Sequence, residues 1–133
     1  MGRLYMSRAS KSTLSRDSKY FVEKNRYHEL RYFCLQYPIW KKRRNALVGL
    51  ATTRNREPTE VEAFERIALE KKIKMVEFSA ESAAFDLSHW LLIGVTTGLP
   101  YDKINAADRI PCGRELYYAM YRKFFWILSS IRD

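Results

Sequence analysis

Residues 98–131 read GLPYDKINAADRIPCGRELYYAMYRKFFWILSSI. Pro100 suits the first turn of a short helix, because the N–H that a proline lacks would have no partner there. Pro111 and Gly113 then shape a turn, and Gly113 is an acceptable N-cap for a long helix that runs to Ile131. The pattern therefore predicts a helix-turn-helix-like unit at the end of the chain.

The long helix carries two kinds of face. An apolar face repeats every three or four residues, which predicts a buried stripe of Leu116, Met120, Phe124, Ile127 and Ile131. A second face is basic and aromatic and consists of Arg114, Tyr118 and Arg122, with Tyr117, Tyr121 and Lys123 beside them. Arginine bonds bidentately to guanine while tyrosine and lysine hold phosphates, so this face suits a DNA major groove. The competing interpretation is a core-packing helix whose basic residues only face solvent.

Helical periodicity extends over most of the remaining chain. It predicts helices at 17–36, 39–50, 85–96 and 101–107, with a loop at 51–57. Pro38 should end or kink the first helix and push Tyr37 out of the helical region. No strand-like alternation persists in the sequence. The predicted fold class is all-α, a compact bundle of about five to six helices.

The middle helix begins at a capping box. In Thr59-Glu60-Val61-Glu62 the threonine oxygen accepts from one free amide and the last glutamate reaches back to another. The helix should span roughly twenty residues. Its predicted buried stripe is Val61, Phe64, Ala68, Met75 and Phe78.

Composition limits the class of protein. The chain has 133 residues, 47% of them hydrophobic, which suits one domain with a modest core. We expect a flexible basic tail at 1–16 and a single helical domain at 17–133, with 98–131 as its helix-turn-helix-like part. No apolar run could span a membrane, and the N-terminus lacks the apolar segment of a secretory signal. Cys34 and Cys112 are expected to be free thiols of a cytoplasmic protein.

Residues for catalysis or metal binding are sparse. His28 and His89 fall on different predicted helices without a ligand at metal-binding spacing, so we expect no metal site. There is no phosphate-binding glycine loop and no Gly-x-Ser-x-Gly motif. Cys112 lies near a helix N-terminus, where a thiol pKa can fall, but no general base accompanies it. The expectation is a protein that is not an enzyme and needs no cofactor.

Positive charge is concentrated in the first half of the chain. Lys and Arg number 24 against 15 Asp and Glu, a net charge of +9, which favours a polyanionic partner. The densest run is Lys41, Lys42, Arg43 and Arg44. A phosphate-contacting patch extended by Arg31, Arg54 and Arg56 is one interpretation, and a solvated helix face is the other. A membrane surface is not expected, because the basic and apolar stripes do not share one long helix.

The order of these segments resembles a known family. YHELRYFCLQYPIWKKRRNAL (27–47), a polar gap, an acidic-basic middle helix and GLPYDKINAADRIPCGRELYYAMYRKFFWIL (98–128) resemble small phage and prophage regulators of the RinA/ArpU kind. That resemblance implies a late-gene transcription activator in a bacterial host, with a C-terminal helix-turn-helix similar to the last DNA-binding region of sigma factors. The matching residues of the final helix are Tyr117, Tyr118, Arg122 and Lys123. This chain departs from the motif at Asp108 and Arg109, where a core leucine and a glycine are usual.

Three functions follow as hypotheses. The first is a phage or mobile-element regulator that binds double-stranded DNA, with RNA polymerase or another host protein left open as a further partner. The second is an anti-CRISPR or other anti-defence inhibitor that binds a host nucleic-acid-handling protein. The third is a small terminase subunit, which would bind DNA and assemble into rings. The sequence leaves the oligomeric state and the DNA target open.

Overall fold

The computed structural model describes residues 19–54 and 57–133. The predicted tail at 1–16 lies outside them. The described residues form six α-helices and one 3-10 helix and contain no strand, so the prediction of an all-α bundle is confirmed. In chain order the elements are α1 (Lys24–Leu35), α2 (Tyr37–Arg54), α3 (Glu60–Ala83), η1 (Phe85–Leu87), α4 (Ser88–Thr97), α5 (Tyr101–Ala107) and α6 (Arg114–Ile131).

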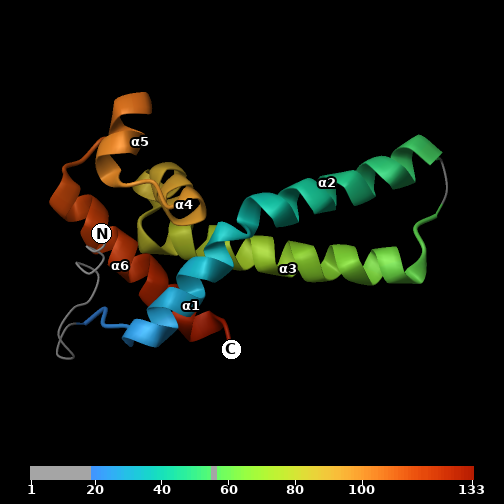
Figure 1. Ribbon diagram of the computed structural model, residues 1–133, viewed down its shortest axis with the longest axis horizontal. Helices are drawn as coiled ribbons and strands as arrows, with labels where there is room; N and C mark the ends of the chain where they lie inside the picture. The colour runs from blue at the N-terminus through green and yellow to red at the C-terminus, as the bar shows by residue number, and fades with distance from the viewer. Residues whose placement is uncertain (1–18, 55–56) are drawn as a thin grey trace.

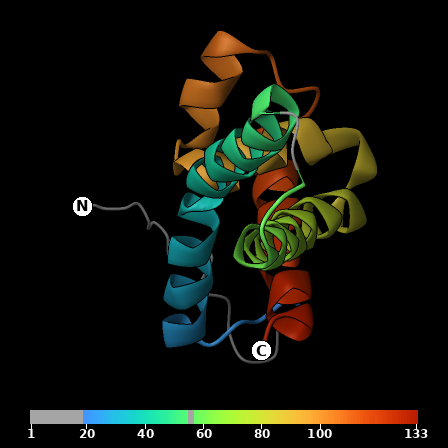
Figure 2. The same cartoon turned by 90° about the vertical axis from the view of Figure 1, so that its right-hand side faces the viewer.

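A long helical hairpin projects from the rest of the molecule. α2 and α3 lie side by side along it, while α1, α4, α5 and α6 gather around the end of α3 that leads into η1 (Figure 1, Figure 2). Trp40 and Leu47 of α2 are buried, and the ammonium of Lys72 on α3 lies 5.7 Å from the centre of the Trp40 ring. The guanidinium of Arg43 reinforces it by donating to both carboxylate oxygens of Glu65, at 2.7 and 3.0 Å.

Two predictions about α1 and α2 are wrong. α2 begins at Tyr37 and runs to Arg54, so Tyr37 is helical and residues 51–54 are helix and not loop. Pro38 is the second residue of α2, where the missing N–H needs no partner, so it starts this helix and does not distort the one before. α1 ends at Leu35, and only Gln36 separates the two helices.

Local capping chemistry behaves as predicted. The Thr59 side chain accepts from the Glu62 N–H at 3.1 Å, and the Glu62 carboxylate accepts from the Thr59 N–H at 2.9 Å. Gly98 ends α4 with φ at 77°, a left-handed conformation that favours glycine. Gly113 is the N-cap of α6. α3 and α6 therefore begin, and α4 ends, where the sequence predicts.

The predicted buried stripe of α3 is wrong. Val61, Phe64, Ala68 and Phe78 are exposed, and Met75 is half-buried. The residues that face the core instead are Ile73, Val76, Ser79, Ala80 and Ala83. This helix has apolar residues on two faces, and α3 packs against α4 and α6 through the face that carries Ile73, Val76 and Ala80. The exposed face carries Val61, Phe64, Ile67 and Phe78.

A clamp joins α1 to the end of α6. The Arg26 guanidinium donates to the Ser129 hydroxyl and to the Ser129 carbonyl, each at 3.1 Å, and also to the Arg132 carbonyl. Glu29 pairs with Arg26 at 2.8 Å and with Arg132 at 3.3 Å. The Arg132 guanidinium in turn lies 4.2 Å from the centre of the Phe33 ring. The end of α6 is thus held by charge-assisted hydrogen bonds.

No helix formed by the described residues is long and apolar enough to cross a membrane.

Candidate nucleic-acid interface

The core side of α6 is not the one predicted from spacing. The buried residues of α6 are Tyr117, Phe124, Phe125 and Leu128. Leu116 and Ile131 are exposed and Met120 and Ile127 are half-buried, so the predicted stripe holds fully only at Phe124. The helix is rotated so that Tyr117 enters the core and Leu116 leaves it.

Tyr117 therefore cannot contact DNA in this conformation, and its placement on the DNA-contacting face is wrong. Its side chain is 0% exposed, and burial raises its pKa above the ordinary tyrosine value. Tyr121 is half-buried, and burial together with the nearby Tyr27 hydroxyl raises its pKa well above the ordinary value. The rings of Tyr121 and Phe125 contact edge to face, with centres 5.1 Å apart. Both tyrosines thus serve the core.

The column of residues 114, 118 and 122 stays at the surface. Arg114 is exposed, and Tyr118 and Arg122 are half-buried. The Tyr118 hydroxyl accepts from the Tyr101 N–H at 3.0 Å, and the Tyr101 hydroxyl donates to the Cys112 carbonyl at 2.6 Å. These two bonds tie the first turn of α5 to the first turns of α6. The two helix starts consequently lie at one surface.

The two arginines of this column differ in environment. Arg114 donates to the Asp102 carboxylate, a pair whose side chains are 61% and 70% exposed. That pairing raises the pKa of Arg114. Arg122 is partly withdrawn from water, which lowers its pKa below the ordinary arginine value. Any ligand of Arg114 would therefore have to displace the Asp102 carboxylate.

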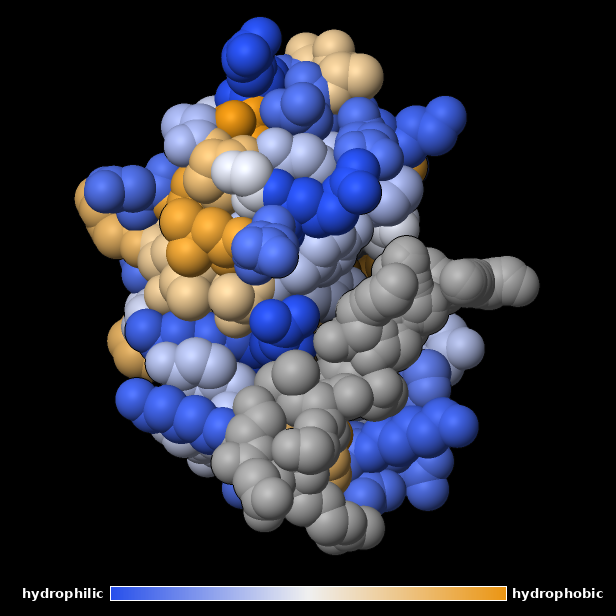
Figure 3. All heavy atoms as spheres, turned by 90° about the vertical axis from the view of Figure 1, so that its left-hand side faces the viewer, coloured by the Kyte–Doolittle hydropathy of each residue, from blue (hydrophilic) through white to orange (hydrophobic). Residues whose placement is uncertain are grey.

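α1 adds a further cation near Gly98 and Tyr121. The Tyr27 and Phe125 rings contact with centres 5.0 Å apart, and the Arg31 charge acts on Tyr121, so α1 and α6 run antiparallel. Arg31 thereby lies level with the middle of α6, half-buried next to Gly98. Figure 3 looks onto the end formed by α5 and α6, where hydrophilic side chains border an apolar area.

Lys123 lies on a different part of α6 from Arg114. Its ammonium is 5.9 Å from the centre of the Tyr20 ring, and that ring also contacts Trp126 at 5.3 Å between centres. Lys123 is half-buried in this aromatic contact. It therefore flanks the column of residues 114, 118 and 122 and does not extend it.

The predicted basic patch on α2 is largely engaged within the hairpin. Arg43 pairs with Glu65, as described above, and Arg44 lies 3.9 Å from the Glu70 carboxylate. Lys41 lies over the Tyr37 ring at 5.4 Å, and Lys42 is exposed. The four residues spread around α2, as expected for consecutive positions of a helix. Of the residues named as extensions of the patch, Arg56 lies outside the described residues.

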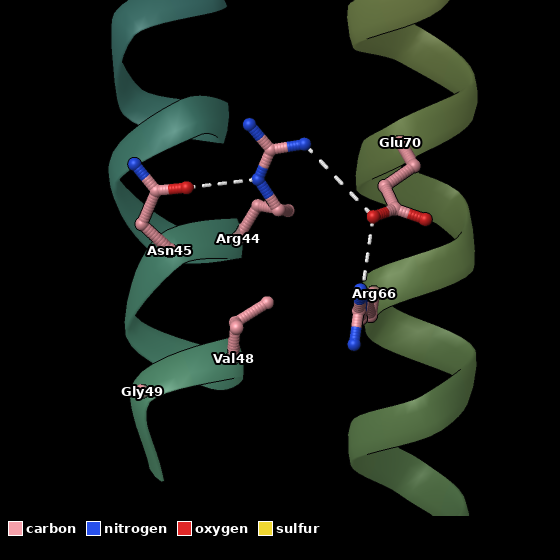
Figure 4. A pocket seen from close by; sticks show the side chains of 6 residues that line it. All are labelled: Arg44, Asn45, Val48, Gly49, Arg66 and Glu70. Atoms are coloured by element: carbon pink, nitrogen blue, oxygen red, sulfur yellow. Dashed lines mark hydrogen bonds and ion pairs between the residues drawn. The ribbon is translucent and has the colours of Figure 1, made fainter. Parts of the chain in front are cut away.

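Arg44 also lines a shallow pocket between α2 and α3. The other lining residues are Asn45, Val48, Gly49, Arg66 and Glu70 (Figure 4). Arg44 points from α2 toward Glu70 of α3, and its Nε donates to the Asn45 oxygen at 2.9 Å. Arg66 donates to the same Glu70 carboxylate at 3.2 Å. Because Glu70 already neutralises one of two guanidinium groups, this pocket offers little excess positive charge.

Asp108 and Arg109, the departures from the family motif, lie in the connection between α5 and α6. The Asp108 carboxylate is 2.9 Å from the His89 ring nitrogen, and its carbonyl accepts from the Trp90 indole N–H at 3.1 Å. Ile110, two residues later, is buried. Asp108 thus makes polar contacts with α4 at the position where the motif has a leucine. These contacts hold the α5–α6 connection against α4.

Cys34 and Cys112 are both free thiols, as predicted. Burial raises the pKa of each thiol, so Cys112 lacks the lowered pKa of a nucleophile. Within residues 19–54 and 57–133, no three His, Cys, Asp or Glu side chains come together as metal ligands.

No family model, curated protein or solved structure matches this chain significantly.

Proposed function

We propose that the protein is a DNA-binding regulator that docks on a duplex through the surface where α5 and α6 begin. The contacting residues would be Arg114, Tyr118 and Arg122. The main supporting observation is that Arg114 is exposed and Tyr118 and Arg122 are only half-buried, while Tyr117 is fully buried in the core. A helix with one packed face and one basic face, open at its N-terminal turns, has the geometry of a recognition helix.

The proposal assigns different tasks to the two arginines. Arg114 stands at the first turn of α6, the part that reaches base edges in a major groove. Arg122 lies two turns further along, where a guanidinium reaches the phosphate backbone. Exposed Lys42 and half-buried Lys41 on α2 would add affinity without sequence preference. The phage origin and the activator role rest on the family resemblance alone and form part of the same proposal.

The test is selection from a random duplex library with the purified protein, repeated at low and high salt. A regulator of this kind enriches one motif at both salt concentrations, because base contacts survive where phosphate contacts weaken. Enrichment of no motif, or loss of all binding at moderate salt, would refute sequence-specific recognition.

The inhibitor hypothesis remains the second candidate. The observation in its favour is the pairing of Arg43 and Arg44 with carboxylates of α3, which removes part of the free charge that DNA would need. Pull-down from a bacterial lysate after nuclease treatment separates the two functions. A direct protein partner survives that treatment, whereas a partner bridged by DNA does not.

A further inference from the structure

The outward face of α3 exposes four large apolar side chains. Val61 is 75% exposed, Phe64 65%, Ile67 63% and Phe78 54%. Positions 64, 67, 71, 74 and 78 are separated by three and four residues, so their side chains share one face of the helix. This face points away from Ile73, Val76 and Ala80, which are buried. From Val61 to Phe78 it extends roughly 25 Å along the helix.

A further exposed apolar side chain lies on α2. Ile39 is 67% exposed and lies one turn before Arg43, whose guanidinium pairs with Glu65 of α3. Val61 lies one turn before Glu65 and is therefore on the same side of the hairpin. An exposed apolar area of this kind on a folded protein usually marks a site where another molecule binds.

Two lysines occupy the middle of the outward face of α3. Lys71 and Lys74 are both exposed, and neither forms an ion pair with any described residue. The nearby carboxylates point elsewhere, since Glu65 pairs with Arg43, Glu70 with Arg44 and Arg66, and Glu77 accepts from the Tyr37 hydroxyl. The face therefore has apolar ends and an uncompensated positive centre.

This charge pattern argues against a second copy as the occupant. If two α3 helices met antiparallel through this face, Lys71 and Lys74 of one copy would oppose the same lysines of the other. Like charges in direct opposition are destabilising, and each chain carries a net charge of +9. A partner with carboxylates opposite the two lysines and apolar side chains on either side would satisfy the whole face.

We propose that the outward face of α3 docks an acidic amphipathic helix of a different protein. Val61, Phe64, Ile67 and Phe78 would pack against the apolar residues of that helix, and Lys71 and Lys74 would pair with its carboxylates. Apolar contacts at helical spacing supply the affinity of such pairs, and charges set the choice of partner. This docking face is separate from the α5–α6 surface, so it does not depend on DNA binding.

The test uses synthetic peptides of about 20 residues, long enough to cover the face as a helix. The acidic peptide has leucines on one face and glutamates in its central turns. A second peptide has the same composition in shuffled order, and a third has lysines in place of the glutamates. Binding of the full chain to each labelled peptide is measured by fluorescence anisotropy, and analytical ultracentrifugation reports self-association of the chain alone.

The variants separate apolar contact from charge. Phe64→Ser with Ile67→Ser removes two apolar contacts, and Lys71→Glu with Lys74→Glu reverses the central charge. Lys24→Glu with Lys103→Glu makes the same charge change at exposed positions on α1 and α5. All six residues are exposed, so circular dichroism should show that each variant remains folded.

We expect the wild type to bind the acidic peptide and not the shuffled or basic one. Each double substitution on α3 should weaken that binding at least about tenfold. The charge-reversed variant should prefer the basic peptide, while the Lys24 and Lys103 variant should bind like the wild type. Failure of the acidic peptide to bind, equal binding of the shuffled peptide, or no effect of charge reversal would overturn the proposal. A wild-type dimer that Phe64→Ser with Ile67→Ser converts to monomer would also overturn it, because a second copy would then cover the face.

Discussion

The hydroxyl of Tyr117 on α6 lies directly against Gly94 on α4. A Cβ added to Gly94 would overlap that hydroxyl oxygen and would come within 3.4 Å of the Ile104 side chain. The same hydroxyl is buried and is the one such side-chain atom in the described residues without a hydrogen-bond partner. The close approach of α4 and α6 thus depends on a glycine opposite a tyrosine.

Gly94→Ala should destabilise the fold by about 1–3 kcal/mol, although alanine is the better helix former. The overlap with Tyr117 forces the two helices apart. Tyr117→Phe alone should be neutral or stabilising, because it removes a buried hydroxyl that has no partner. Combined with Gly94→Ala, it should restore most of the lost stability. Urea denaturation of the three variants measures these effects, and a tolerated Gly94→Ala would mean that α4 and α6 pack differently.

Arg26→Ala should destabilise the protein by about 1–3 kcal/mol, since the guanidinium holds two carbonyls and a hydroxyl at the end of α6. Arg26→Lys should recover little of this, because one ammonium cannot reach all three acceptors. In the Arg26→Ala variant, amide hydrogen exchange should show reduced protection first at residues 128–132. Unchanged protection of these amides would mean that Arg26 does not hold the end of α6.

Asp102→Asn should strengthen DNA binding while leaving the thermal midpoint nearly unchanged. Asp102 pairs with Arg114 at an exposed position, where an ion pair contributes little to stability. The substitution removes a carboxylate that competes with DNA for Arg114 and frees the arginine. Glu115→Gln is the matched control, because Glu115 is also exposed on the first turn of α6. An equal gain in affinity from both variants would indicate a general charge effect and not a role of the Asp102–Arg114 pair.

The protein should become less stable at acidic pH, because protonation of Glu29 and Glu65 weakens their ion pairs with arginine. Arg43 lowers the pKa of Glu65 by hydrogen bonding, and Arg26 and Arg132 lower that of Glu29 in the same way. A carboxyl whose pKa is lowered in the folded state stabilises the fold above the ordinary value of 4.5, and this contribution is lost as the pH falls through the lowered pKa. Glu29→Gln with Glu65→Gln should lower the thermal midpoint at pH 7 and flatten its decline below pH 4.5. If the thermal midpoint of the double variant fell below pH 4.5 as steeply as that of the wild type, groups other than Glu29 and Glu65 would cause the loss of stability in acid.

Local chemistry explains which parts of the fold are readable from the sequence. The capping box at Thr59, the left-handed Gly98 and the N-cap at Gly113 each depend on residues within a few positions of one another. Those signals place α3, α4 and α6 correctly. Pro38 misleads because it can either end one helix or begin the next, and here only Gln36 separates the two helices.

The side of a helix that faces the core is harder to predict. α3 has apolar residues on two faces, and periodicity cannot tell which face the other helices cover. In α6 the neighbours Leu116 and Tyr117 are both apolar enough for the core, and Gly94 on α4 makes room for the tyrosine. The helices that pack against α6 determine which of these two residues is buried. The sequence alone therefore could not show that Arg114 is exposed and Tyr117 is buried.

The central claim is that Arg114 and Arg122 contact DNA, and a gel-shift titration on the selected duplex tests it most directly. Arg114→Ala with Arg122→Ala is compared with Lys71→Ala and Lys74→Ala, which removes the same amount of positive charge from the outward face of α3. We predict that the arginine variant loses at least about tenfold in affinity and relaxes its sequence preference, while the lysine variant loses much less. Equal losses from the two variants, or full specific binding by the arginine variant, would contradict the assignment of α6 as the DNA-contacting helix.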